Sequence, residues 1–197
     1  KVMKELIEND RIVGGFTAKS TEVVAEFYEE FVEGEVIRTK AKTAELCKLV
    51  ENSSRDVQIA FANEISMICD KADINVWELI ELANHHPRVN ILQPGTGVGG
   101  HCIAVDPWFI VSDFPEEAHI IKNARERNDY KTQWVIERIK TACLKFELEH
   151  GRKPTIGILG LTFKPNIDDL RESPSILVID SLSNAGYDLK CVEPNIS

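Results

Sequence analysis

The stretch TAELCKLVENSSRDVQIAFANEISMICDKA, residues 43–72, decides the architecture of the middle of the chain. It contains neither glycine nor proline, and apolar residues recur at intervals of three, four and seven, the period of one face of an α-helix. The residues of that face are Leu46, Val50, Val57, Phe61, Ile65 and Ile68. The spacing therefore predicts one long amphipathic helix.

More helices are expected on the carboxyl side of this stretch. Asn75 is typical of an N-cap for a helix that ends near Ala83, a loop rich in histidine, proline and glycine covers residues 84–107, and a long helical pattern covers roughly 115–148. We therefore expect an all-helical central domain over residues 41–150. Because two long amphipathic helices offer more apolar surface than one small domain can cover, this domain is the expected homodimer interface.

Strand–helix–strand patterns lie on both sides of the central region. On its amino side, residues 11–15 and 35–39 are strand-like and flank a helical pattern over 18–33. On its carboxyl side, residues 155–160 predict a buried strand entering a glycine turn, Ser173 and Pro174 predict a helix start, Gly186 predicts its end, and residues 187–192 predict the next strand. The expected fold class is α/β, with truncated Rossmann-like units at both ends, residues 1–40 and 151–197. We expect the chain to be part of a longer protein.

Composition narrows the possible functions. The net charge of −9, without a basic run, argues against a nucleic-acid partner. No apolar run approaches the length of a membrane span and no signal peptide is evident, so a cytoplasmic protein without a membrane partner is expected. Five scattered cysteines without a C-x-x-C pair, and His85–His86 without further ligands at suitable spacing, favour neither a disulfide framework nor a metal site.

The segment 93–107, QPGTGVGGHCIAVDP, is the densest candidate for chemistry. Its glycines match the dinucleotide fingerprint as a string, but Pro94 precedes them and Pro107 is expected to interrupt any following helix, so we reject that interpretation. Glycines let a backbone approach a ligand and present N–H groups, and they would leave Cys102 accessible in an amide-rich place that favours a thiolate. Asp106 lies within plausible reach. A flexible loop beside a buried cysteine is an equally open alternative.

Two further polar patterns are candidates for binding. Lys48, Asn52 and Arg55 follow helical spacing and share one side of the first long helix, although a solvated helix face would give the same pattern. Lys164 and Arg171 lie in FKPNIDDLRESP, residues 163–174, after the predicted strand, where ligands of open α/β sheets bind. They would suit phosphate groups, whereas the alternative is a surface loop with internal ion pairs.

Together these segments resemble the UDP-glucose/GDP-mannose dehydrogenase family. The resemblance follows the order DRIVGG (10–15), Glu45-x-x-Lys48-x-x-x-Asn52, GVGGHC (97–102) and the 163–174 segment. Within the family, residues 52–57, 86–95 and 101–109 are most similar to members that oxidise UDP-N-acetyl-D-mannosamine. Enzymes that act on UDP-glucose usually have lysine where this chain has Val105.

The resemblance implies an NAD-dependent oxidation of a UDP-sugar at C6 in two steps. Cys102 would capture the intermediate aldehyde as a thiohemiacetal, which becomes a thioester and is hydrolysed to the uronic acid. Lys48 would be the general acid/base, Asn52 would support it, and Asp106 would orient the water. The implied N-terminal NAD domain and a catalytic glutamate would precede Lys1, so the chain alone is expected to be inactive.

The resemblance also assigns binding residues. Those that would hold the UDP-sugar are Arg55, His86, Arg88, Gly99 and Phe163, and those that would face the cofactor or the diphosphate are Lys164 and Arg171. Two alternatives stay open: a UDP-N-acetylglucosamine or UDP-glucose 6-dehydrogenase, and a non-catalytic dimerisation module that keeps the sequence of the family.

Overall fold

The computed structural model describes residues 2–196. The chain divides into two compact units after Glu51, and the division falls inside the long helix α3, Ala41–Ala72. Each unit contains one pair of parallel strands.

The first unit is a short βαβ arrangement. Its elements are α1 (Val2–Glu8), β1 (Arg11–Gly15), α2 (Ala18–Glu29) and β2 (Val36–Lys40), with β1 and β2 parallel. Thr17 caps α2 because its side chain accepts from the backbone N–H of Ser20, whose hydroxyl accepts in return from the N–H of Thr17. The helix ends at Glu29, earlier than the sequence pattern predicts, and β2 begins one residue later than predicted.

Every element between β2 and the next strand is a helix: α3, α4 (Val76–Ala83), α5 (Asp106–Asp113) and α6 (His119–His150). The Asn75 side chain caps α4 by accepting from the N–H groups of Trp77 and Glu78. The expectation that Pro107 interrupts any helix is wrong, because α5 starts at Asp106 with Pro107 in its first turn. Proline is tolerated there since the first N–H groups of a helix have no partner within the helix.

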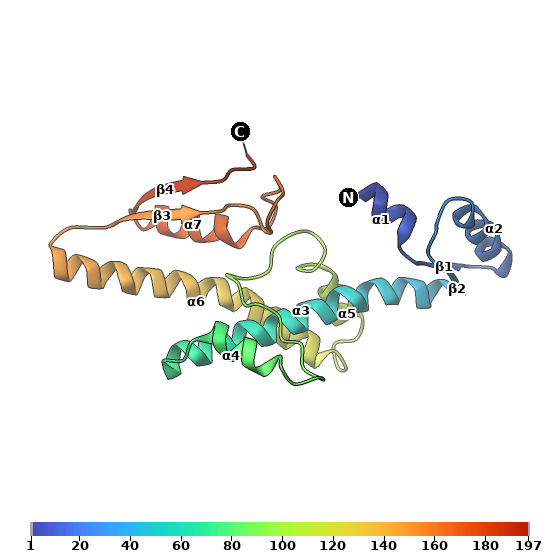
Figure 1. Ribbon diagram of the computed structural model, residues 1–197, viewed down its shortest axis with the longest axis horizontal. Coiled ribbons are helices and arrows are strands. Elements are labelled where there is room, and N and C mark those ends of the chain that lie inside the picture. Colours follow the sequence, from blue (N-terminus) through green and yellow to red (C-terminus); the bar gives the residue numbers. More distant parts are fainter. Residues whose placement is uncertain (1, 197) are drawn as a thin grey trace. The chain divides into compact units, whose positions relative to one another are not determined.

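The second unit ends in another βαβ arrangement, β3 (Thr155–Leu159), α7 (Pro174–Asn184) and β4 (Asp188–Val192). Val178 and Leu182 of α7 form a buried cluster with Ile136 of α6, and side chains from both strands pack against it. Figure 1 shows α7 running beside β3 and α6. This packing joins the strand pair to the long helix.

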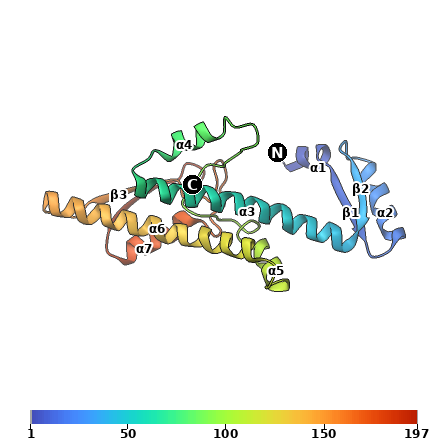
Figure 2. The same cartoon turned by 90° about the horizontal axis from the view of Figure 1, so that it is seen from below.

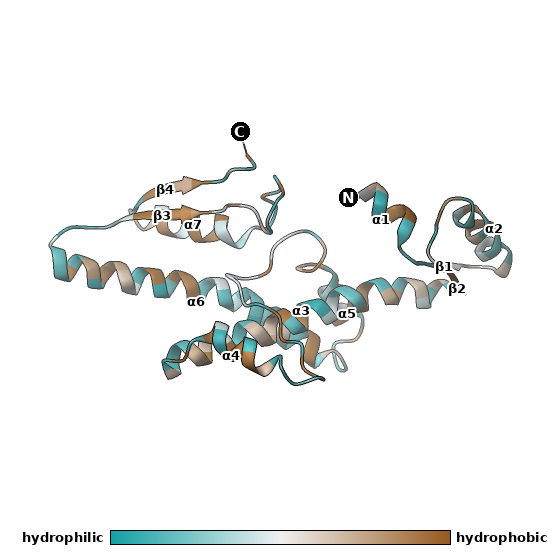
Figure 3. Cartoon of the chain, in the orientation of Figure 1, coloured by the Kyte–Doolittle hydropathy of each residue, from teal (hydrophilic) through white to brown (hydrophobic). Residues whose placement is uncertain are grey.

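The interface between α3 and α6 is polar. Asp56 and Asn63 of α3 are fully buried, as are Arg125 and Asn128 of α6. The apolar stripe predicted for α3 points elsewhere, since Phe61 is 51% exposed and Ile68 is 56% exposed. Figure 2 shows α3 and α6 from a second side, and Figure 3 shows hydrophobic and hydrophilic residues alternating along them. Among residues 2–196 no helix is long and apolar enough to cross a membrane.

Candidate active site

Cys102 occupies a helical turn that leads into α5. Its side chain is exposed, and its carbonyl oxygen accepts from the backbone N–H groups of Val105 (3.0 Å) and Asp106 (2.8 Å). Residues four positions apart on such a turn lie on the same side. This spacing favours a thiol of Cys102 and a carboxylate of Asp106 on the same side of the turn.

Asn52 of α3 holds that carboxylate from a distant part of the sequence. Its side-chain amide donates to Asp106 Oδ2 at 2.5 Å, and the contact is partly buried. A carboxylate fixed by an amide donor keeps its other lone pairs available as acceptors. Asp106 is therefore linked to Asn52 through its side chain and to Cys102 through its backbone.

The glycine-rich loop within residues 93–107, called the glycine loop below, packs directly against the 163–174 segment. A Cβ on Gly99 would lie 2.4 Å from the carbonyl oxygen of Glu172 and 2.7 Å from Cβ of Phe163. The N–H of Gly100 donates to the carbonyl oxygen of Arg171 at 3.2 Å, and the Phe163 ring covers Gly100. Two motifs about 65 residues apart in the sequence thus form one surface, and glycine is needed because the backbones approach so closely.

Two cations lie on this surface. The guanidinium of Arg171 is bound to Asp169 at 2.7 Å and is 65% exposed, and it holds the pKa of Asp169 down at about 2. Hydrogen bonding to Asp169 raises the pKa of Arg171, and the nearby Cys102 raises it further. The ammonium of Lys164 lies 5.4 Å from the centre of the Phe163 ring. Arg171 is therefore paired within its own segment, as the alternative of a surface loop with internal ion pairs predicts, although most of its guanidinium stays exposed.

Lys48, Arg55, His86 and Arg88, the other predicted polar site residues, are exposed. Lys48 belongs to the first unit, and its ammonium is 3.9 Å from the carboxylate of Glu51. Arg55 is on an exposed part of α3. His86 and Arg88 lie in the exposed loop after α4, where the N–H of Arg88 donates to His86 Nδ1. Within residues 2–196 no three His, Cys, Asp or Glu side chains gather as a metal site requires.

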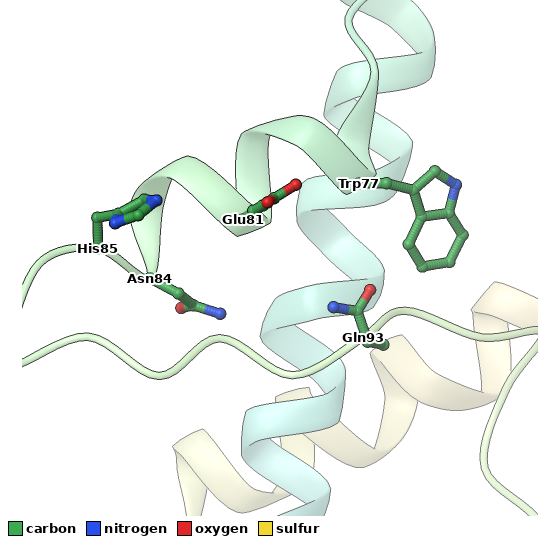
Figure 4. Close-up of a pocket in the computed structure, with 5 residues that line it drawn as sticks. All are labelled: Trp77, Glu81, Asn84, His85 and Gln93. Atoms are coloured by element: carbon green, nitrogen blue, oxygen red, sulfur yellow. The ribbon is translucent and has the colours of Figure 1, made fainter.

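A shallow pocket of about 570 Å³ lies beside α4. Figure 4 shows Trp77, Glu81 and His85 along the helix side and Gln93 on the passing loop. The side chain of Asn84 bonds both the N–H (2.7 Å) and the carbonyl (3.0 Å) of Ile91. Asn84 therefore fixes the loop that carries His86 and Arg88.

A buried polar network beneath the glycine loop was missed at the level of sequence. The network contains Asp56, Asn63, Arg125 and Asn128, and Thr132 beside it bonds the loop separately. A signal was present, because polar residues recur at helical spacing in both long helices. Only the pairing of the two helices reveals that these polar faces meet.

Comparison with known proteins assigns the family. The central domain of the UDP-glucose/GDP-mannose dehydrogenase family matches residues 42–130, and the UDP binding domain of the same family matches residues 157–197. Together they cover about two thirds of the chain. The chain belongs to the UDP-glucose/GDP-mannose dehydrogenase family.

Relatives within this dehydrogenase family carry two kinds of name. A UDP-N-acetyl-D-mannosamine dehydrogenase of Campylobacter jejuni is 59% identical over 197 residues, which is 100% of this chain and 47% of the relative. An NDP-N-acetyl-D-galactosaminuronic acid dehydrogenase of Ralstonia nicotianae is 59% identical over 181 residues, 92% of this chain and 42% of the relative. The chain therefore spans about half the length of the curated relatives it matches.

A solved structure shares the fold. The UDP-D-ManNAc dehydrogenase of Pyrococcus horikoshii superposes with a TM-score of 0.88 at 37% identity, over 100% of this chain and 47% of that chain. The expected α/β class is confirmed in its coarser form, since the chain is a helix-rich mixed fold with small parallel sheets that matches dehydrogenase structures.

Proposed function

We propose that the full-length protein containing this chain oxidises UDP-N-acetyl-D-mannosamine at C6 to the uronic acid in two NAD-dependent steps. The observation that carries the proposal is the turn that aligns Cys102 with Asp106, which Asn52 holds from α3. A thiol, a fixed carboxylate and an amide donor are the parts that covalent capture and hydrolysis of an aldehyde require. Relatives at 56–59% identity carry the corresponding name.

Cys102 is the proposed nucleophile. Its thiolate adds to the carbon of the C6 aldehyde, and the carbonyl oxygen takes up a proton, which gives a thiohemiacetal. NAD, when bound, accepts the hydride in each of the two oxidations. After the second oxidation Cys102 carries a thioester, and water releases the acid and restores the thiol.

Asp106 is the proposed water-positioning residue, since Asn52 holds its carboxylate and its backbone N–H bonds the Cys102 carbonyl. Asn52 keeps that carboxylate in place and presents its amide beside it. Lys48 lies one helical turn before Asn52 in the sequence of α3 and is the proposed general acid/base for the C6 alcohol.

The remaining residues are proposed to hold the ligands. The exposed guanidinium of Arg171 and the ammonium of Lys164 fit the negative charge of a nucleotide diphosphate, either of the sugar or of the cofactor. Arg55, His86, Arg88, Gly99 and Phe163 are proposed for the UDP-sugar. Because this chain has a net charge of −9, such local cations are required to attract a dianionic ligand.

We also propose that the four helices α3 to α6 form the domain through which two copies associate. The apolar stripe of α3 remains exposed at Phe61 and Ile68, while the side facing α6 is polar. A second copy that covers this stripe would remove apolar surface from water.

The decisive experiment measures NADH formation by the full-length protein with UDP-N-acetyl-D-mannosamine. Two NADH per sugar are expected, and Cys102→Ser is expected to abolish or stall turnover. Cys191→Ser is the matched control because Cys191 is the other exposed cysteine. Loss of activity in the Cys191 variant, or full activity in the Cys102 variant, would contradict the assignment of Cys102.

The identity to an NDP-N-acetyl-D-galactosaminuronic acid dehydrogenase is as high as the identity to a UDP-N-acetyl-D-mannosamine dehydrogenase. A UDP-sugar of another configuration is therefore a second candidate substrate. UDP-N-acetylgalactosamine, UDP-N-acetylglucosamine and UDP-glucose are therefore assayed in parallel. NADH with one of these alone would keep the dehydrogenase and change its substrate. If no sugar gives NADH and Cys102 is alkylated no faster than Cys191, the non-catalytic dimerisation module is the better interpretation.

A further inference from the structure

One continuous hydrogen-bond chain connects the two ends of the glycine loop through the interior of the α3–α6 pair. At one end the N–H of Gly95 donates to Asn63 Oδ1 at 2.9 Å, and the Asn63 amide donates to Asn128 Oδ1 at 2.8 Å. Asn128 in turn donates to Asp56 Oδ1 at 2.8 Å.

The chain returns to the loop through the buried cation. Arg125 Nη1 donates to the same oxygen of Asp56 at 2.5 Å and to the carbonyl oxygen of Ile103 at 3.5 Å, a long bond. Ile103 directly follows Cys102. A separate bond, from the hydroxyl of Thr132 to the carbonyl oxygen of Thr96 at 2.8 Å, anchors the loop next to Gly95. The segment between these anchors contains all the remaining glycines of the motif and Cys102.

Stability alone gives a poor account of this arrangement. Asp56, Asn63, Arg125 and Asn128 are all fully buried, yet Asp56 Oδ2 and Arg125 Nε have no hydrogen-bond partner within the described residues. A buried ion pair generally stabilises no more than apolar side chains of the same volume would, and an unpaired buried polar atom costs free energy. A polar interface of this kind must therefore contribute something that apolar packing could not.

Polar side chains, unlike apolar ones, can form hydrogen bonds to the backbone of the glycine loop. A glycine-rich loop has few side chains of its own to pack and loses much conformational entropy when it is fixed. Directional hydrogen bonds to the N–H of Gly95 and to the carbonyls of Thr96 and Ile103 fix the backbone of the loop at three points. Both long helices contribute, so the loop is bonded to α3 as well as to α6.

We infer that Asn63, Thr132 and Arg125 are positioning residues for Cys102: through this buried chain, and through the separate bond of Thr132, they set the loop at the geometry in which the thiol captures the aldehyde. The inference rests on the proposed function for its catalytic consequence. A misplacement of about 1 Å can cost roughly a hundredfold in rate. A loosened loop leaves the first oxidation intact and lets free aldehyde escape before capture.

The test compares Asn63→Leu and Thr132→Val with Ser66→Ala in the full-length protein. Ser66 is the matched control because it is buried in the same interface and bonds Lys131 and the Asn63 carbonyl, but has no bond to the loop. Thr132→Val preserves shape and removes one hydroxyl, so it remains informative if Asn63→Leu fails to fold. Thermal unfolding of each variant is measured first, and the variants are then compared at temperatures at which they are equally stable.

The first measurement is amide hydrogen exchange of Val105 and Asp106, whose N–H groups bond the Cys102 carbonyl and lie outside the network. Thr132→Val is expected to speed this exchange about fivefold, the factor that corresponds to one net hydrogen bond, while Ser66→Ala leaves it unchanged. Equal exchange in Thr132→Val and Ser66→Ala would overturn the positioning role. This measurement needs no substrate, so it decides the inference even if the protein oxidises no UDP-sugar.

The second measurement traps free aldehyde with an aminooxy probe during turnover of the sugar that the wild type oxidises. Thr132→Val is expected to release aldehyde and to form fewer than two NADH per sugar, at an unchanged KM. Tight coupling at two NADH per sugar in Thr132→Val would overturn the inference while leaving the proposed function intact. An inactive wild type would instead remove the proposed function.

Discussion

Lys131 is an ammonium group enclosed within the α3–α6 interface. It is only 4% exposed, donates to Ser66 Oγ at 2.6 Å and lies 4.0 Å from the centre of the Trp134 ring. Burial lowers the pKa of Lys131 to about 8, against the opposing charge of Asp70. In the unfolded chain a lysine has a pKa of about 10.4. Below pH 8 the folded protein therefore carries a charge that it solvates poorly.

Replacing Lys131 by methionine is expected to stabilise the protein at pH 7 by on the order of 1–2 kcal/mol. Between pH 8 and about 10.4 the unfolded chain binds more protons than the folded one, so the stability of the wild type rises with pH and the advantage of the variant shrinks. Denaturant unfolding at pH 7 and pH 10 measures both effects. Lys145→Met, at an exposed position of the same helix, is the control; a gain in Lys131→Met that is equal at both pH values would contradict the expectation.

Glu193 is a carboxylate that holds the glycine turn after β3. It accepts from the N–H groups of Leu161 (2.8 Å), Thr162 (3.3 Å) and Asn195 (3.0 Å). These bonds, first among them the one from Leu161, lower the pKa of Glu193 to about 2. The ordinary value is about 4.3, so the stabilisation is complete above that pH and is lost as the pH falls toward 2.

We expect Glu193→Gln to lower Tm at pH 7, because the turn loses a charged acceptor. The difference in Tm from the wild type should shrink as the pH falls from about 4.3 toward 2, because Glu193 becomes progressively protonated. Thermal scans across this range check the prediction, with Glu126→Gln on the exposed side of α6 as control. A deficit in Tm that is constant down to pH 2 would show that charge is not the cause.

At the scale of elements, the packing of the glycine loop on the 163–174 segment depends on Gly99. A methyl group there would meet the backbone of Glu172 at 2.4 Å, so Gly99→Ala must push the two segments apart. A destabilisation of about 1–3 kcal/mol is expected, with faster proteolysis of the loop. Gly95→Ala is the matched control in the same loop, since its nearest neighbour would be the Gly97 carbonyl at 3.7 Å. Equal effects of the two variants would contradict this account.

Local sequence signals predict most elements of the fold but not how they face one another. Asn75, Ser173 and Gly186 mark helix ends as predicted, although the Ser173 hydroxyl donates to the carbonyl of Leu161 instead of capping its own helix. The start of α5 was missed because proline in a first turn has the same appearance in a sequence as proline that breaks a helix.

The same limit applies to the candidate site. Cys102, Asp106 and Asn52 could be selected from residue chemistry and family resemblance, and the structure brings them together. Asp56 and Arg125 could not be selected in this way, since a charge on a helix is usually solvated and the two residues are 69 positions apart. This long-range pairing determines which side of α3 faces α6, and the local periodicity of the sequence does not predict it.

At the scale of the whole molecule, the exposed stripe of α3 predicts the state of association. Phe61 and Ile68 are more than half exposed, and stable interfaces bury about 1,200–2,000 Å² in total. We expect the full-length protein to sediment as a dimer, and the double change Phe61→Glu with Ile68→Glu to shift it toward monomer, because two charges would enter an apolar contact. Phe61→Leu with Ile68→Leu preserves apolar character and should stay dimeric. A dimer that survives both glutamates at micromolar concentration would place the interface elsewhere on the protein.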